Sequence, residues 1–87
     1  MMNFKTRIEE KLGAAFQPVE LDVIDESAKH HGHSGWREGG ETHFRVRIAS
    51  AAFSGKSRVE IHRAINQVLS DELAERVHAL AIEARGL

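Results

Sequence analysis

The stretch HFRVRI, residues 43–48, decides the fold because it carries the clearest strand pattern in the chain. Apolar and basic residues alternate along it, and successive side chains of a strand point to opposite faces of a sheet. The apolar positions are Phe44, Val46 and Ile48. The other face carries His43, Arg45 and Arg47, so we expect His43 to face solvent or a partner rather than the core.

Downstream of this strand, the sequence predicts a short helical turn, two helices and a last strand. Residues 51–53 form the turn, which ends at Gly55. Ser57 and Glu60 have the spacing of a capping box, in which each side chain accepts a backbone hydrogen bond at the helix start. The helix that follows has an apolar stripe formed by Ile61, Ala64, Ile65, Val68 and Leu69. Ser70 is expected to cap a further short helix, and residues 77–82 are expected to form the final strand.

Upstream, the glycine-rich residues 27–40 show no periodicity and are predicted to form a loop. Long loops in compact domains are often functional. Before it, apolar and acidic residues alternate over 19–24, which indicates a strand. Asn3 is a suitable N-cap for a first helix whose apolar residues recur at helical spacing. These residues are Phe4, Ile8, Leu12, Ala15 and Phe16, and Pro18 ends the segment.

The predicted order is helix–strand–strand–helix–helix–strand, an α+β fold with a three-stranded sheet and its helices on one face. The 87 residues suffice for one domain over 1–87. The chain has no cysteine, so a disulfide scaffold, a thiolate nucleophile and an all-cysteine metal site are excluded. A net charge of −1 gives no global attraction to nucleic acid. We find no catalytic motif, no apolar segment of membrane-spanning length and no secretion signal, and therefore expect a cytoplasmic protein that is not an enzyme.

Histidines are the candidate metal ligands. His78 lies in an otherwise apolar strand segment, where the residues alone favour simple packing with its ring nitrogens satisfied by backbone groups. His30, His31 and His33 lie in the long loop and fit a solvated polar loop as well as they fit a metal site. His62 lies beside Arg63 on the capped helix, and we expect it to have a structural role there.

A local basic surface is a second candidate site. It would combine the second strand with the capped helix through Arg45, Arg47, Lys56, Arg58 and Arg63. A solvated charged face is the simpler interpretation, because no aromatic residues alternate with these cations. Trp36, the only tryptophan, is either a packing lid over the loop or an interface anchor.

Several short motifs in this order resemble the BolA family over residues 4–85. They are Asp25-Glu26-Ser27, a loop histidine, Gly40-Glu41-Thr42-His43-Phe44, Phe53-x-Gly55, Arg58, His62-Arg63, Asn66, Leu69 and Val77-His78-Ala79-Leu80-Ala81-Ile82. The resemblance implies a fold similar to the type II KH domain, without the glycine loop by which true KH domains clamp nucleic acid. It also implies a complex with a monothiol glutaredoxin in which a [2Fe–2S] cluster is shared.

In that complex the glutaredoxin would supply a cysteine and a bound glutathione thiol. The resemblance assigns the remaining ligands to His78 and to one loop histidine. Alignment outward from Asp25 favours His30, whereas counting back from Glu41 favours His33. No cofactor is expected in the isolated chain. Some family members are linked to transcription and duplex DNA, but Ile61 replaces an arginine common in relatives and thins the basic helix surface.

Overall fold

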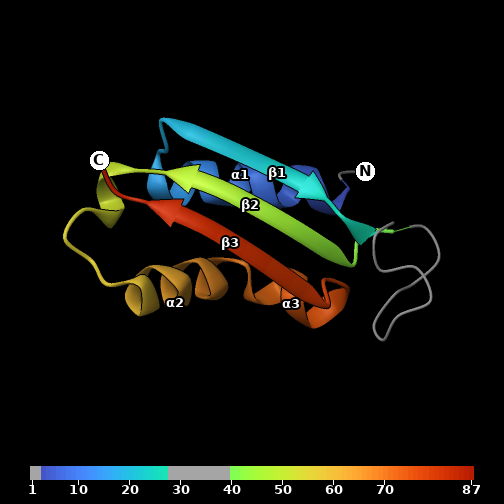
Figure 1. The fold of residues 1–87 in the computed structure, drawn as a ribbon. Coiled ribbons are helices and arrows are strands. Elements are labelled where there is room, and N and C mark those ends of the chain that lie inside the picture. The colour runs from blue at the N-terminus through green and yellow to red at the C-terminus, as the bar shows by residue number, and fades with distance from the viewer. Residues whose placement is uncertain (1–2, 28–39) are drawn as a thin grey trace.

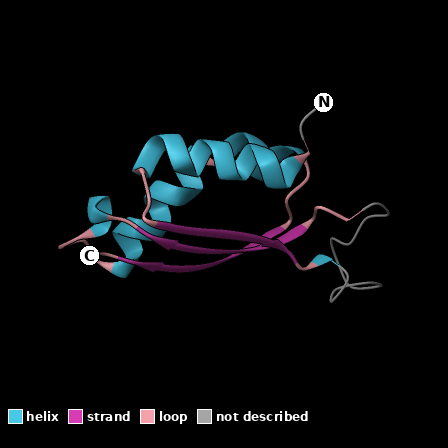
Figure 2. Cartoon of the chain, turned by 90° about the horizontal axis from the view of Figure 1, so that it is seen from above, coloured by secondary structure: helices cyan, strands magenta, loops and turns pink. Residues whose placement is uncertain are grey.

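A computed structural model describes residues 3–27 and 40–87 as one layer of helices on a three-stranded sheet (Figure 1). The element order confirms the predicted one. The elements are α1 (Phe4–Phe16), β1 (Glu20–Asp25), β2 (His43–Ala49), the 3-10 turn η2 (Ala51–Phe53), α2 (Arg58–Val68), α3 (Ser70–Glu75) and β3 (Ala79–Arg85). Figure 2 shows the sheet nearly edge-on with α1 lying along one side of it.

The sheet has the order β1-β2-β3, with β2 in the middle. β1 pairs with β2 antiparallel, and β3 pairs with β2 parallel, so the chain crosses over between them through α2 and α3. Phe44, Val46 and Ile48 of β2 are each at most 2% exposed and form the centre of the core, as their alternation predicts. The core also contains Ile8 and Leu12 from α1, Val23 from β1, Ile61 and Ile65 from α2, and Leu69 between α2 and α3.

Local capping explains where the two long helices begin. The Asn3 side chain accepts a 2.8 Å hydrogen bond from the Thr6 amide, which fixes the start of α1. At α2 the capping box is complete, because the Ser57 hydroxyl accepts from the Glu60 amide and the Glu60 carboxylate accepts from the Ser57 amide. The carboxylate pKa of Glu60 is lowered by these bonds to Ser57.

Two boundary predictions are wrong. Ser70 is the first residue of α3 and not its cap, since the N-cap is Leu69 and no side chain caps this helix. α2 runs almost directly into α3 through Leu69, which leaves no extended residue to serve as a cap. The last strand begins at Ala79, so Val77 and His78 belong to the connection that precedes it.

Glu72 fastens α3 to α1. Its side chain is fully buried, and it accepts bonds from Arg7 Nε at 3.0 Å and from Lys11 Nζ at 2.9 Å. Burial alone would raise the carboxylate pKa, but the bonds from Lys11, its own backbone amide and Arg7 outweigh burial and lower it. Among the described helices, none has the length and apolar character needed to cross a bilayer.

We predict that Glu72→Gln destabilises the fold by about 1–3 kcal/mol at pH 7, because two cations lose a buried charged acceptor. The lowered pKa means that the ionised carboxylate stabilises the fold above the unfolded-state value of about 4.3, and that this contribution is lost as pH falls further. Urea unfolding at pH 7 and pH 3 should therefore show a difference from wild type that shrinks in acid. Glu10→Gln, which removes an exposed carboxylate on α1, is the matched control. An equal difference at both pH values would contradict this role.

Candidate functional site

His78 is exposed and lies directly before β3, at the end of the sheet where β2 begins. Its backbone is fixed, because the carbonyl of Thr42 accepts bonds from the amides of His78 at 2.7 Å and Ala79 at 3.1 Å. The neighbouring Val77 is buried and anchors the connection in the core. The expectation that His78 packs inside an apolar strand is therefore wrong, and its imidazole is accessible to a partner or metal.

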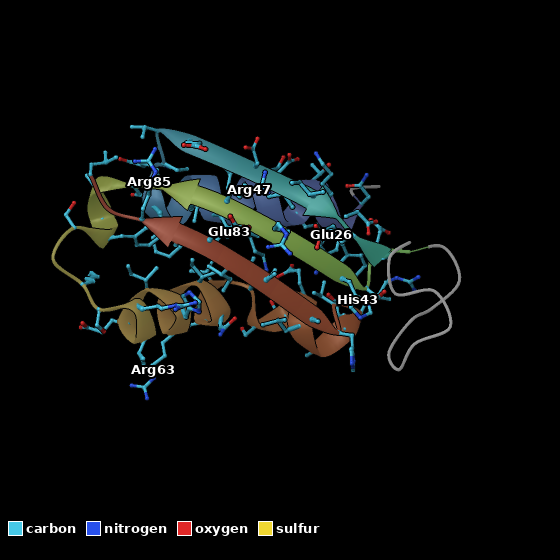
Figure 3. The ribbon with its side chains drawn as sticks, viewed as in Figure 1. Glu26, His43, Arg47, Arg63, Glu83 and Arg85 are labelled. Carbon is cyan, nitrogen blue, oxygen red and sulfur yellow. The ribbon has the colours of Figure 1, made fainter. Side chains whose placement is uncertain are left out.

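His43 lies beside His78 and is buried, which corrects the expectation that it faces solvent. Its side is the open face of the sheet, yet only 5% of the residue is exposed. Its ring packs against the ring of His78, with centroids 5.5 Å apart and planes tilted by 54°. Figure 3 shows His43 at this end of the sheet, with Arg85 at the opposite end.

A buried polar cluster surrounds His43. Ser27 and Thr42 are 2% and 0% exposed. The Ser27 hydroxyl oxygen accepts from the amides of Thr42 at 2.9 Å and His43 at 3.2 Å. Thr42 Oγ1 lies 2.8 Å from His43 Nδ1. Among the described residues, no fully buried side-chain nitrogen or oxygen lacks a hydrogen-bond partner, as buried polar groups require.

Asp25 joins the two chain segments that flank residues 28–39. One of its carboxylate oxygens accepts from the Ser27 amide at 2.9 Å, and the other accepts from the Glu41 amide at 3.1 Å. On the far side, Arg76 donates from Nε at 2.9 Å and from Nη2 at 2.7 Å to the carbonyl oxygen of Gly40. Arg76 is two residues before His78. Its bonds to Gly40 therefore tie the connection that carries His78 to the residue that directly follows segment 28–39.

The backbone at this junction has a tight turn. Gly40 and Glu41 both have positive φ angles, 74° and 62°. Glu41 is held in this uncommon conformation by its own contacts, since its carboxylate also accepts a 2.7 Å bond from the amide of Phe4. The start of α1, the loop end and the His78 connection therefore meet at one place.

The predicted loop residues His30, His31, His33 and Trp36 lie outside the described residues. Within the described ranges, no group of three or more histidine, cysteine or acidic side chains is placed to hold a metal ion. The described donor is the exposed imidazole of His78, with the His43 ring packed behind it. Imidazole is a suitable ligand for iron, and an iron–sulfur cluster accepts it in place of thiolate. This donor fits a partial ligand set whose other members come from elsewhere.

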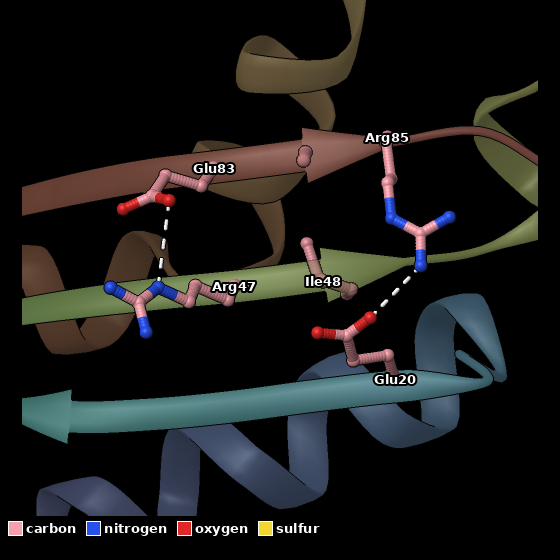
Figure 4. Close-up of a pocket in the computed structure, with 6 residues that line it drawn as sticks. Glu20, Arg47, Ile48, Glu83 and Arg85 are labelled. Carbon is pink, nitrogen blue, oxygen red and sulfur yellow. Dashed lines mark hydrogen bonds and ion pairs between the residues drawn. The ribbon is translucent and has the colours of Figure 1, made fainter.

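The predicted basic surface is divided between two places. Arg45 and Arg47 lie on the open face of the sheet, where acidic residues neutralise them. Arg45 contacts Glu26 at 2.9 Å and Glu83 at 2.6 Å, and these bonds raise its pKa while Arg45 in turn lowers the pKa of Glu83. Figure 4 shows the adjoining hollow of about 250 Å³, with Arg47 facing Glu83 and Arg85 facing Glu20.

Lys56 and Arg58 lie instead at the start of α2, in the wall of a groove of about 570 Å³ between α2 and β3. Ile61 and Ile82 contribute apolar surface to this groove. Arg63 is exposed and points away from the sheet (Figure 3). Of the ion pairs among described residues, none involves these three cations. This smaller group lies at the opposite end of β3 from His78.

His62 is half-buried on α2, and its ring makes no hydrogen bond with any described residue. A hydrogen bond from His62 that ties the helix to the sheet, which is one form the expected structural role could take, is therefore not found in the part of the chain that the structure describes. Sequence reasoning also missed the joining role of Asp25, Ser27 and Arg76. Asp side chains commonly accept a hydrogen bond from the backbone amide two residues later in the chain. The Asp25–Ser27 bond could therefore have been predicted. The contact of Arg76 with Gly40 spans 36 positions and has no local signal.

The fold and this site define a small α+β domain that presents an exposed histidine beside the residues that follow segment 28–39. The family model for BolA-like proteins matches residues 12–86. A Sinorhizobium protein, described as an uncharacterized protein in the cobS 5′ region, is 53% identical over 83 residues, covering 94% of this chain and 89% of that one. The Escherichia coli DNA-binding transcriptional regulator BolA is 47% identical over 81 residues, covering 93% and 73%.

A solved structure of the BolA domain of SufE1 from Arabidopsis thaliana is also similar. It superposes with a TM-score of 0.88 and 48% identity, covering 99% of this chain and 94% of that chain. The chain belongs to the BolA family.

We predict that Asp25→Ala releases the junction around residues 27 and 41. The amides of Ser27 and Glu41 lose their side-chain acceptor, so the hydrogen exchange of each should speed up by about fivefold, because each bond contributes about 1 kcal/mol. Asp22→Ala, an exposed aspartate of the same strand, is the matched control and should leave both amides unchanged. Unchanged exchange in Asp25→Ala would show that the other contacts hold the junction alone.

Proposed function

We propose that this BolA-family domain is a non-enzymatic adaptor that pairs with a monothiol glutaredoxin and supplies histidine ligands to a shared [2Fe–2S] cluster. The observation that carries the proposal is the position of His78. It is exposed, its backbone is fixed by Thr42, and Arg76, two residues before it, binds Gly40, which directly follows the segment that contains His30, His31 and His33. The proposed ligands are His78 and one histidine of that segment, His30 or His33.

The donor chemistry supports a shared site. This chain has no cysteine, so it offers imidazole nitrogen but no thiolate. The glutaredoxin cysteine and its bound glutathione would complete the ligand set, and imidazole ligation raises the reduction potential of such a cluster. His78 would bind through a ring nitrogen, while Thr42 and Arg76 keep its segment against the loop junction. The proposal places the protein in the cytoplasm, where thiol systems keep partner cysteines reduced.

We expect the protein, mixed with a cluster-loaded glutaredoxin, to form a one-to-one coloured complex whose visible circular dichroism differs from that of the glutaredoxin homodimer. His78→Ala should abolish this spectral change, because one iron loses its imidazole ligand. Size exclusion alongside the spectrum separates loss of ligation from loss of binding. His30→Ala and His33→Ala, compared in the same way, identify the second ligand.

His62→Ala is the control for this experiment, because it removes a half-buried imidazole from α2 and not from the site. It should leave the spectrum of the complex unchanged. A His78→Ala complex with the wild-type spectrum would refute the ligand assignment. A glutaredoxin that stays homodimeric would refute the partnership.

A second candidate function, binding of duplex DNA as a transcriptional regulator, is favoured by one observation. Lys56, Arg58 and Arg63 are exposed cations near the start of α2 without an ion pair among the described residues. The Escherichia coli relative is named as a DNA-binding transcriptional regulator. Opposing it, the near-neutral net charge gives weak general attraction, and Arg45 and Arg47 are already neutralised.

If this surface binds DNA, removing its cations should weaken binding and its salt dependence. For the double variant Lys56→Gln/Arg58→Gln we expect the plot of log affinity against log salt to become less steep. The magnitude of its negative slope should decrease by about 2, roughly one per lost phosphate contact. Arg47→Gln, an ion-paired arginine of the open face, is the control and should leave the slope unchanged. Fluorescence anisotropy of a labelled duplex over a salt series measures this, and no binding at low salt would refute the function.

A further inference from the structure

The buried cluster of Ser27, Thr42 and His43 is not explained by packing alone. These residues lie where the sheet's open face meets the loop junction, yet at most 5% of each is exposed. Burying a hydroxyl or imidazole costs free energy unless its hydrogen bonds are made. The three polar side chains contact one another or the backbone of this cluster, beside the proposed ligand His78. Such an arrangement is typical of groups that orient a ligand.

The hydrogen bonds around Thr42 bear on which nitrogen of His43 carries the proton. Ser27 Oγ already accepts two amide bonds, from Thr42 and His43, which occupy its two lone pairs. Thr42 Oγ1 lies 3.3 Å from Ser27 Oγ but only 2.8 Å from His43 Nδ1. The one proton of the Thr42 hydroxyl can serve only one of these two contacts. Because Ser27 Oγ already has two amide donors, we assign that proton to the shorter contact, donated to His43 Nδ1. In this tautomer the ring proton of His43 is on Nε2.

The same two residues hold His78. The Thr42 carbonyl accepts from the His78 amide at 2.7 Å, which fixes the backbone. The His43 ring, held by the Thr42 hydroxyl, packs against the His78 ring at 5.5 Å between centroids. Backbone and side chain of His78 are thus both restrained through Thr42, one directly and one through His43.

We propose that His43 is a positioning residue for His78, locked by Thr42 as its Nε2–H tautomer so that its ring holds the His78 imidazole in one orientation. The geometry rests on the described contacts, whereas its meaning for the cluster rests on the proposed function. A purely structural role would require only a ring of similar volume, which phenylalanine supplies. A positioning role requires the hydrogen bond from Thr42 as well.

The first test uses the isolated, isotope-labelled protein at one fixed pH. In the wild type, ring ¹⁵N shifts should show His43 with an acceptor Nδ1 and a protonated Nε2, and His78 should have a single χ1 rotamer. In Thr42→Val, which keeps the shape but removes the hydroxyl, His43 should populate both tautomers and His78 should average over rotamers. His43→Phe should have the same effect on His78. His43→Asn, which retains a hydrogen-bonding group near Nδ1, should restore part of the restraint.

Thr6→Val on α1 is the matched control, because the same side-chain change there lies far from His43 along the chain and outside this cluster. Thermal melts confirm that each variant is folded. A single His78 rotamer in both Thr42→Val and His43→Phe would overturn the positioning role. Proton placement on Nδ1 in the wild type would overturn the tautomer.

The second test measures affinity for cluster-loaded glutaredoxin. Loss of a group that orients a metal ligand costs roughly 10–100-fold in affinity, and we expect Thr42→Val to weaken the complex within that range. If His78→Ala weakens the complex but Thr42→Val does not, His43 does not position the ligand. If the rotamer change is seen but His78→Ala leaves complex and spectrum unchanged, the proposed function fails while the positioning contact stands.

Discussion

The pairing of β2 on both of its edges is the constraint on which the rest of this structure depends. β1 and β3 do not contact each other in the sheet, so both are placed only through β2. The inner face of β2 supplies the fully buried centre of the core. The start of β2 also fixes the site. Thr42 directly precedes β2, and its carbonyl accepts bonds from the amides of His78 and Ala79 at the start of β3. One strand therefore sets the register, the core and the position of His78 together.

Features set by neighbouring residues could be predicted from the sequence. The Asn3 cap and the Ser57–Glu60 capping box depend on residues three positions apart, and both are present. The alternation in β2 likewise predicts which of its side chains form the core. The Ser70 cap was wrong because α2 and α3 follow each other without the extended residue that a cap needs. A capping motif indicates that a helix can begin nearby, and the short connection between α2 and α3 decides which residue occupies the cap position.

The candidate site was less predictable, because its parts come from distant segments. Alternation correctly placed His43 on the face opposite Phe44, but its contacts with Ser27, 16 positions away, and with His78 have no local signal. The basic residues were divided for a similar reason. Arg45 and Arg47 face away from the helices because the pleat requires it, and Glu26 and Glu83 arrive beside them only through the sheet pairing. Periodicity therefore gave the face of each residue but not its neighbours.

The parallel pairing of β2 with β3 separates the two ends of that strand by its full length. His78 adjoins one end, and the groove with Lys56 and Arg58 adjoins the other, so about 20 Å of strand lies between them. A protein bound at the histidine end and a polyanion bound in the groove would thus occupy different parts of the surface. The two ends of β3 therefore offer two ligands separate sets of residues on one small domain.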